Sequence, residues 1–89
     1  MRLDKFLKVS RLVKRRTVAN ELCDGGHVQI NGKTAKASAE VKPGDTLRVR
    51  FGNRMLSAVI ERVPEKAISV QEAPTLYRTL GEESQQSDL

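Results

Sequence analysis

Residues 25–32 read GGHVQING, and within this stretch the spacing of apolar residues changes from a helical period to that of a strand. The glycine pair favours the end of a helix. Val28 and Ile30 then alternate with a polar residue, and Asn31-Gly32 is a strong signal of a tight β-hairpin. The sequence therefore predicts an α+β fold, with two short N-terminal helices packed on a small antiparallel sheet.

Upstream of the glycines, residues 2–13 have helical periodicity. One face of the predicted helix consists of Leu3, Phe6, Leu7 and Ser10. The remaining arc carries four cations, which are Arg2, Lys5, Lys8 and Arg11. Asp4 is the single acid among them. Because ordinary surfaces mix charges of both signs, this face favours contact with phosphates, although a solvated charged face stays an alternative.

Three further cations, Lys14, Arg15 and Arg16, precede the second predicted helix at residues 18–24, for which Thr17 is the expected N-cap. Free N–H groups and the helix dipole favour an anion at such a helix start. The cluster is therefore suited to a phosphate backbone. A charged interhelical loop with no ligand is the alternative.

Downstream of the hairpin, a turn is predicted at residues 42–45, where Pro43-Gly44 occupies the central positions. Strands are predicted at residues 46–51 and 55–63. In the first of these strands, Leu47, Val49 and Phe51 are expected to face inward, and Arg48 and Arg50 outward.

The charge is unevenly distributed along the chain. Residues 1–63 carry 14 Lys and Arg against 6 Asp and Glu, a net charge of +8. Residues 64–89 carry 2 against 5, which brings the whole chain to +5. A basic body of this kind favours an anionic partner such as nucleic acid. We predict a basic domain at 1–63 that ends in an extra strand, and an acidic flexible tail at 64–89.

The composition argues against several classes of protein. The single cysteine, Cys23, and the single histidine, His27, are too few for an internal disulfide or a Cys/His metal site. The sequence has no membrane span, secretory signal, phosphate-binding loop or carboxylate pair. We therefore expect a cytoplasmic protein that is not an enzyme and needs no cofactor. Phe6 and Phe51 are assigned to the core, so no platform for stacking unpaired bases is expected.

Five short motifs occur in a recognisable order: RLDK at 2–5, RTVA at 16–19, GHV at 26–28, VQING at 28–32 and VKPGD at 41–45. Over residues 1–52 the chain resembles the S4 (alpha-L) RNA-binding domain. Each motif is weak alone, but the ordered set is specific. Within the family, the chain resembles the stand-alone heat-shock-type proteins, and among them the RqcP subfamily of bacterial ribosome-associated quality control.

The resemblance implies a role for the chain. Proteins of this kind bind the rRNA of the separated large ribosomal subunit together with peptidyl-tRNA, and support poly-alanine tailing of nascent chains by a NEMF-type factor. The family's RNA-contacting arginines correspond to Arg2 and Arg16, and Asp4 matches an acid that orients a neighbouring cation. Arg15 stands where many S4 domains have serine. The chain is expected to be a monomer, with an RNA surface formed by Arg2, Lys5, Lys8, Arg11, Lys14, Arg15 and Arg16.

Two other functions are alternatives. One is a DNA-binding regulator with a helix-turn-helix-like arrangement, but the second helix offers only Asn20, Glu21 and Asp24 as polar groups, a poor set for reading guanines. The other is the RNA-binding subunit of an RNA-modifying enzyme. That function would require a catalytic domain for which this chain has no room.

Overall fold

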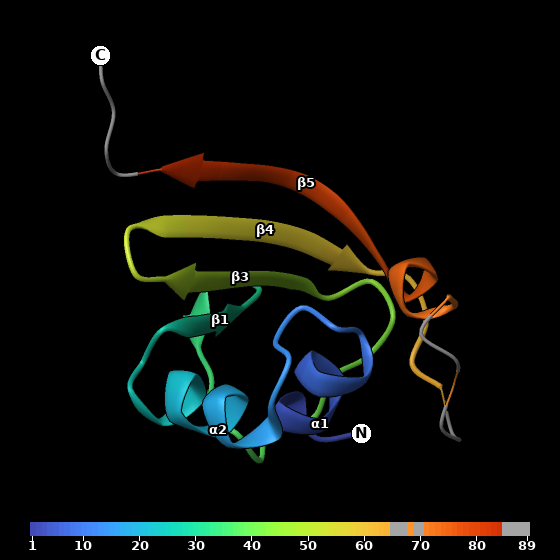
Figure 1. The fold of residues 1–89 in the computed structure, drawn as a ribbon, viewed down its shortest axis with the longest axis horizontal. Helices are drawn as coiled ribbons and strands as arrows, with labels where there is room; N and C mark the ends of the chain where they lie inside the picture. Colours follow the sequence, from blue (N-terminus) through green and yellow to red (C-terminus); the bar gives the residue numbers. More distant parts are fainter. Residues whose placement is uncertain (65–67, 69–70, 85–89) are drawn as a thin grey trace.

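The computed structural model describes residues 1–64, 68 and 71–84, and it has two layers (Figure 1). The helices α1 (Leu3–Val9) and α2 (Arg16–Asp24) lie on one face of a five-stranded antiparallel sheet. Its strands are β1 (Val28–Ile30), β2 (Lys33–Thr34), β3 (Thr46–Phe51), β4 (Arg54–Ile60) and β5 (Tyr77–Ser84), in the order β2-β1-β3-β4-β5. A short 3-10 helix, η1 (Ala73–Leu76), precedes β5. The predicted α+β fold is confirmed.

Both helices have bounds that differ from those predicted. α1 ends at Val9 because the chain turns sharply just after it, where Arg11 has a φ of 66° in the left-handed region. The Ser10 hydroxyl supports this turn by donating a hydrogen bond to the carbonyl oxygen of Leu7 at 3.3 Å. α2 begins at Arg16, with Arg15 at the N-cap position. The expectation that Thr17 caps α2 is therefore wrong.

The two predicted turns form, and they are joined to each other. Asn31 and Gly32 have φ values of 53° and 85°, as the tight hairpin requires. The Asn31 side chain donates Nδ2–H to Asp45 Oδ1 at 3.1 Å and accepts the backbone N–H of Thr46 at 3.0 Å. The other oxygen of Asp45 accepts the backbone N–H of Lys42 at 2.9 Å. Side chains of the VQING and VKPGD motifs thus join the hairpin turn at residues 31–32 to the turn at residues 42–45 by hydrogen bonds.

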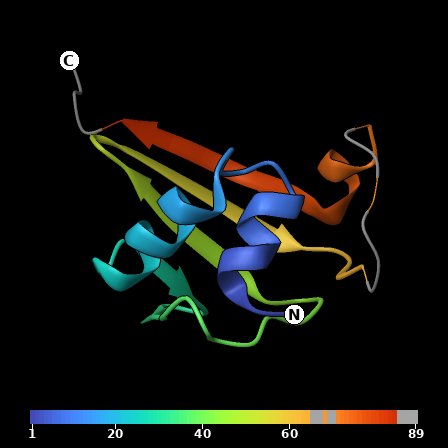
Figure 2. The same ribbon diagram turned by 60° about the horizontal axis from the view of Figure 1, so that its bottom comes forward.

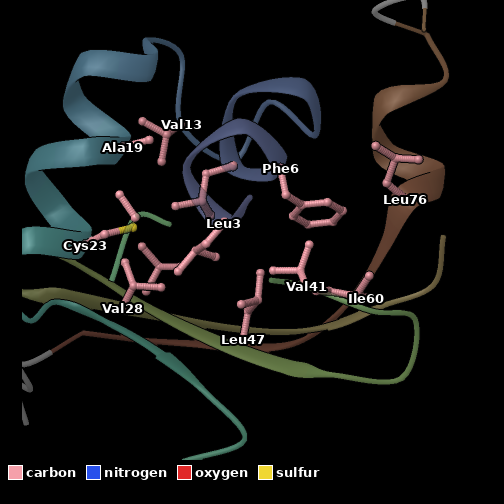
Figure 3. Close-up of a cluster of buried hydrophobic side chains, with 13 residues drawn as sticks. Leu3, Phe6, Val13, Ala19, Cys23, Val28, Val41, Leu47, Ile60 and Leu76 are labelled. Atoms are coloured by element: carbon pink, nitrogen blue, oxygen red, sulfur yellow. The ribbon is translucent and has the colours of Figure 1, made fainter. Parts of the chain in front are cut away.

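The core fills the space between the two layers (Figure 3). Leu47 and Val49 of β3 are buried while Arg48 and Arg50 are exposed, which confirms the predicted alternation. A fully buried leucine or phenylalanine stabilises a fold by roughly 1.5–3 kcal/mol through apolar burial. The helices contribute Leu3, Phe6, Leu7, Ala19 and Cys23 to this cluster.

The structure differs from the predicted flexible tail at residues 73–84, which form η1 and β5. β5 pairs with β4 from Tyr77 opposite Ile60 to Ser84 opposite Arg54, with an irregularity between Ser57 and Ala58. The polar composition of this segment concealed the strand, because an edge strand is held largely by backbone hydrogen bonds that carry no side-chain pattern. The parts of the predicted tail at 65–67, 69–70 and 85–89 lie outside the described residues.

In the part of the chain that the structure describes, neither helix has the length and apolar composition needed to cross a bilayer.

The buried end of η1 offers a test of its role in the fold. Leu76 is 0% exposed, whereas Leu80 in β5 is 51% exposed. Leu76→Ala is expected to lower the free energy of unfolding by about 2–5 kcal/mol, because it leaves a cavity in the core. Leu80→Ala, the same chemical change at the surface, is expected to stay within about 0.5 kcal/mol. Denaturant unfolding measures both free energies. Equally small effects of the two substitutions would contradict the placement of Leu76 in the core.

Candidate nucleic-acid interface

A buried carboxylate connects the two helices. Asp4, in the first turn of α1, is 2% exposed. Its Oδ1 accepts hydrogen bonds from Arg2 Nε at 3.2 Å and from the backbone N–H of Lys5 at 2.8 Å. Its Oδ2 accepts from Arg16 Nε at 3.4 Å and from Asn20 Nδ2 at 3.5 Å. The Asp4 carboxylate therefore binds Arg2, which directly precedes α1, and Arg16, which begins α2.

The two arginines keep much of their surface in solvent. The side chains of Arg2 and Arg16 are 51% and 50% exposed, although Asp4 between them is buried. A guanidinium has five N–H donors, so donation to one carboxylate leaves others for a ligand. The shared anion also reduces the repulsion between the two cations and fixes where they point. We call Arg2, Asp4 and Arg16 the arginine pair site.

The ionisation of Asp4 follows from this arrangement. Burial on its own raises the pKa of the carboxyl. The hydrogen bonds from Arg2, Arg16 and Asn20, together with the charge of Arg16, outweigh burial and leave the pKa below its ordinary value. Asp4 is therefore a carboxylate at neutral pH, as its role of holding two cations requires.

A shallow hollow of about 410 Å³ lies beside Asp4 and Arg16, and it is also lined by Thr17, Asn20 and Glu21 of α2. Asn20 was not among the predicted RNA-binding residues. Its spacing carried the signal, because residues four apart lie on the same face of a helix and Asn20 is four residues after Arg16. The sequence did not show that the helix face in question is turned toward Asp4.

The other predicted cations are distributed over more than one place. Arg11 and Lys14 lie in the loop between α1 and α2 and line a second hollow of about 400 Å³, to which Tyr77 of β5 contributes. Lys5 and Arg15 are exposed, and Lys8 is half-buried. Arg2 and Arg16 are therefore connected through Asp4, whereas Arg11 and Lys14 line a different hollow.

Cys23 has no features of a reactive thiol. It is buried in the core cluster at 2% exposure. Burial first, and then the charges of Asp4 and Asp24, raise its pKa to about 11. The thiol is therefore protonated at neutral pH and packs as a small apolar group. Within the described residues, no three side chains of His, Cys, Asp or Glu come together as a group that could hold a metal ion.

Comparison with known proteins identifies the family of this chain. The S4 domain family model matches residues 1–47, the segment that contains both helices and the whole arginine pair site. The chain belongs to the S4 domain family. The match ends within β3, so β4 and β5 lie beyond the S4 domain as the family defines it.

Relatives extend the similarity to most of the chain. A Bacillus subtilis protein named RQC P-site tRNA stabilizing factor is 52% identical over 83 residues, which are 93% of this chain and 95% of that protein. Heat shock protein 15 of Escherichia coli is 35% identical over 82 residues, 92% of this chain and 62% of that protein. The structure of Vibrio cholerae Heat Shock Protein 15, described as trimeric, has a TM-score of 0.80 at 35% identity and covers 89% of this chain and 80% of that chain. The resemblance to stand-alone S4 proteins is confirmed.

The lowered pKa of Asp4 predicts how stability depends on pH. A carboxyl whose folded pKa lies below its unfolded value of about 3.9 stabilises the fold above that value, and its contribution is lost as the pH falls through the folded pKa. Asp4→Asn is therefore expected to be less stable than wild type at pH 7. The difference is expected to shrink below about pH 4, where wild type also loses the carboxylate. Urea unfolding across this pH range measures it.

Asp24→Asn is the control for this experiment. It makes the same chemical change at an exposed position at the end of α2. The control is expected to stay within about 0.5 kcal/mol of wild type at every pH. A gap between wild type and Asp4→Asn that did not narrow in acid would show that the carboxylate is not what joins the arginines.

Proposed function

We propose that this chain is a non-enzymatic RNA-binding factor of ribosome-associated quality control, which binds rRNA and P-site tRNA on the large ribosomal subunit. The arginine pair site is the observation that carries the proposal. Two guanidiniums held by one buried carboxylate, each half in solvent, are preorganised for the oxygens of a phosphate backbone. Preorganisation lowers the entropic cost of binding, because the side chains are already ordered before the ligand arrives.

The side chains of α2 favour binding to the phosphate backbone of folded RNA over base recognition in the major groove of duplex DNA. Glu21 and Asp24 are exposed on this helix, but carboxylates only accept hydrogen bonds and cannot bind the N7 and O6 acceptors of guanine in a major groove. Asn20, the side chain best suited to reading an adenine, already donates to Asp4. Val18 is 39% exposed and has no polar group to offer a base. These features argue against the DNA-binding alternative, while the arginine pair supports contact with the backbone of folded RNA.

The partners follow from the family and from the charge. Relatives that are about half identical to this chain take their name from the stabilisation of P-site tRNA in this pathway. We propose that this chain acts likewise, on large subunits that carry peptidyl-tRNA in the cytoplasm, while a NEMF-type factor adds the alanine tail. The chain would bind RNA through its cations and its complementary shape, and it would catalyse no reaction. Its monomeric state stays a prediction, and one stand-alone relative is described as trimeric.

The predicted RNA surface is part of this proposal. The full set consists of Arg2, Lys5, Lys8, Arg11, Lys14, Arg15 and Arg16. Arg2 and Arg16 are the central members, because only these two donate to Asp4 through their side chains among the seven. The exposed cations around them attract phosphates of any sequence. When these cations neutralise the phosphate backbone, its condensed counterions are released.

The proposal predicts that the arginine pair controls association with the large subunit. Arg2→Gln with Arg16→Gln removes two charges but leaves side-chain N–H groups for Asp4, so the buried carboxylate keeps donors. Each lost phosphate contact is expected to cost roughly 1.5–3 kcal/mol. Co-sedimentation with purified large subunits carrying peptidyl-tRNA, at several salt concentrations, should show a loss of binding and a shallower salt dependence.

Arg48→Gln with Arg50→Gln is the matched control. It removes the same charge from the outer face of β3, on the side of the sheet opposite the helices. This variant is expected to bind nearly as well as wild type. Equal loss in both pairs would mean that net charge alone drives association, and retention by the first pair would refute the arginine pair site. Preference for duplex DNA over subunits in a gel shift would favour the regulator alternative.

A further inference from the structure

The helical layer leaves part of the sheet uncovered on its inner face. A groove of about 480 Å³ lies there, with its floor formed by residues of β3, β4 and β5 and one wall by the loop between the helices. Figure 2 shows this loop extending across β4 and β5, at the edge of the helical layer. The volume falls in the range of about 300–1,000 Å³ that is typical of sites for small ligands.

The floor of the groove is apolar and partly aromatic. Phe51 at the end of β3, Leu56 of β4 and Tyr77 at the start of β5 line it, and all three are half-buried. The register explains why they share this face. Leu56 lies opposite the buried Val49, and Tyr77 lies opposite the buried Ile60. Phe51 follows Val49 by two residues on β3, so all three side chains project toward the helices. Phe6 is fully buried, as predicted, and Phe51 packs against the core cluster but stays half-buried, so part of its ring is left at the surface for a ligand.

The wall of the groove is cationic. Arg11 lines it from the loop, where its backbone has a φ of 66°. This conformation is uncommon for a residue other than glycine, and it belongs to the sharp turn that follows α1. Arg11 and Lys14 also line the adjoining hollow of about 400 Å³, again with Tyr77. Tyr77 thus belongs to two hollows that cations border.

We propose that this groove binds one unpaired nucleotide of an RNA, with its base packed on Tyr77 and Phe51 and its phosphate at Arg11 and Lys14. The site is separate from the arginine pair and goes beyond the proposed function, on which it rests only in taking RNA as the partner. Aromatic floors accept any base because every base has a flat π-face. The arrangement therefore adds affinity for an unpaired base without selecting its identity.

An acidic peptide is the other class of ligand that cations on an apolar groove would attract. The continuity of positive charge along the chain favours RNA. Lys14 is followed directly in the chain by Arg15 and Arg16, so one continuous cationic segment runs from the groove to the arginine pair. A duplex held at the arginine pair therefore has a path of positive charge along which an adjoining single strand can reach Tyr77.

Tyr77 is the only tyrosine in the chain, so 3-fluorotyrosine labelling gives one ¹⁹F resonance that reports on the groove. The probes are a short blunt RNA hairpin and the same hairpin with a single-stranded adenosine extension. We expect the extended hairpin to shift the resonance saturably and the blunt one to leave it in place. The extension is also expected to tighten binding by roughly 5- to 150-fold, the range that stacking on an aromatic side chain supplies per base.

Two variants refine the test. Tyr77→Leu is expected to abolish the gain from the extension while keeping affinity for the blunt hairpin. Arg11→Asn is expected to weaken binding of the extended hairpin more than that of the blunt one, because it removes a phosphate contact in the groove as well as one charge of the RNA surface. The variant keeps the fold because asparagine tolerates a positive φ. Arg50→Gln removes one charge from the outer face of the sheet and is expected to leave the gain unchanged. The ¹⁹F measurement itself needs no substitution, so it decides the matter even if Tyr77→Leu fails to fold.

The outcomes separate this inference from the proposed function. If neither hairpin binds, RNA binding itself is refuted and the groove proposal falls with it. If both hairpins bind equally and the ¹⁹F resonance stays in place, the arginine pair stands and the groove proposal is overturned. If a polyglutamate peptide shifts the resonance and the extended hairpin does not, the groove is a site for acidic peptides and the RNA assignment is overturned.

Discussion

The contact between Asp4 and the two arginines is the constraint on which the helical layer depends. α1 has 7 residues and α2 has 9, and isolated helices of this length are not stable in water. Apolar packing on the sheet supplies most of their stability, but apolar contacts do not fix rotation as hydrogen bonds do. The buried carboxylate of Asp4 accepts hydrogen bonds from Arg16 and Asn20 of α2 as well as from Arg2 and Lys5, and these bonds set how α2 is turned relative to α1. A buried charge with this many partners is costly to leave unpaired, so alternative packings are disfavoured.

The same contact explains why a structural feature is also a candidate binding feature. Arg2 donates to Asp4 through two of its nitrogens and Arg16 through one, and about half of each side chain stays in water. The core thereby orders two cationic groups at the surface without a ligand. An S4 domain can in this way present fixed positive charge on a chain too small to build a deep pocket. Asp4 is thus as much a part of the candidate interface as the two arginines that it holds.

The sheet is wider than the helical layer, and this mismatch creates the second feature of the surface. α1 and α2 cover the part of the sheet that holds Leu47 and Val49, while Tyr77 and Phe51 stay half-buried at its margin. β5 supplies hydrogen bonds to the edge of β4, which would otherwise be open to pairing with another chain. In doing so it brings Tyr77 next to the loop that carries Arg11. The groove therefore exists only because a strand outside the family match completes the sheet.

The sequence by itself determined the local features of this protein. The change of period at 25–32, the Asn31-Gly32 turn and the alternation in β3 are each encoded within a few residues, so pattern was enough to predict them. The arginines, too, were visible as a motif. Tertiary structure decided which cations meet, because Arg2 and Arg16 are joined only when α2 packs against α1. It also decided β5 and the groove, since an edge strand is held by backbone pairing with β4 and leaves little trace in its side chains.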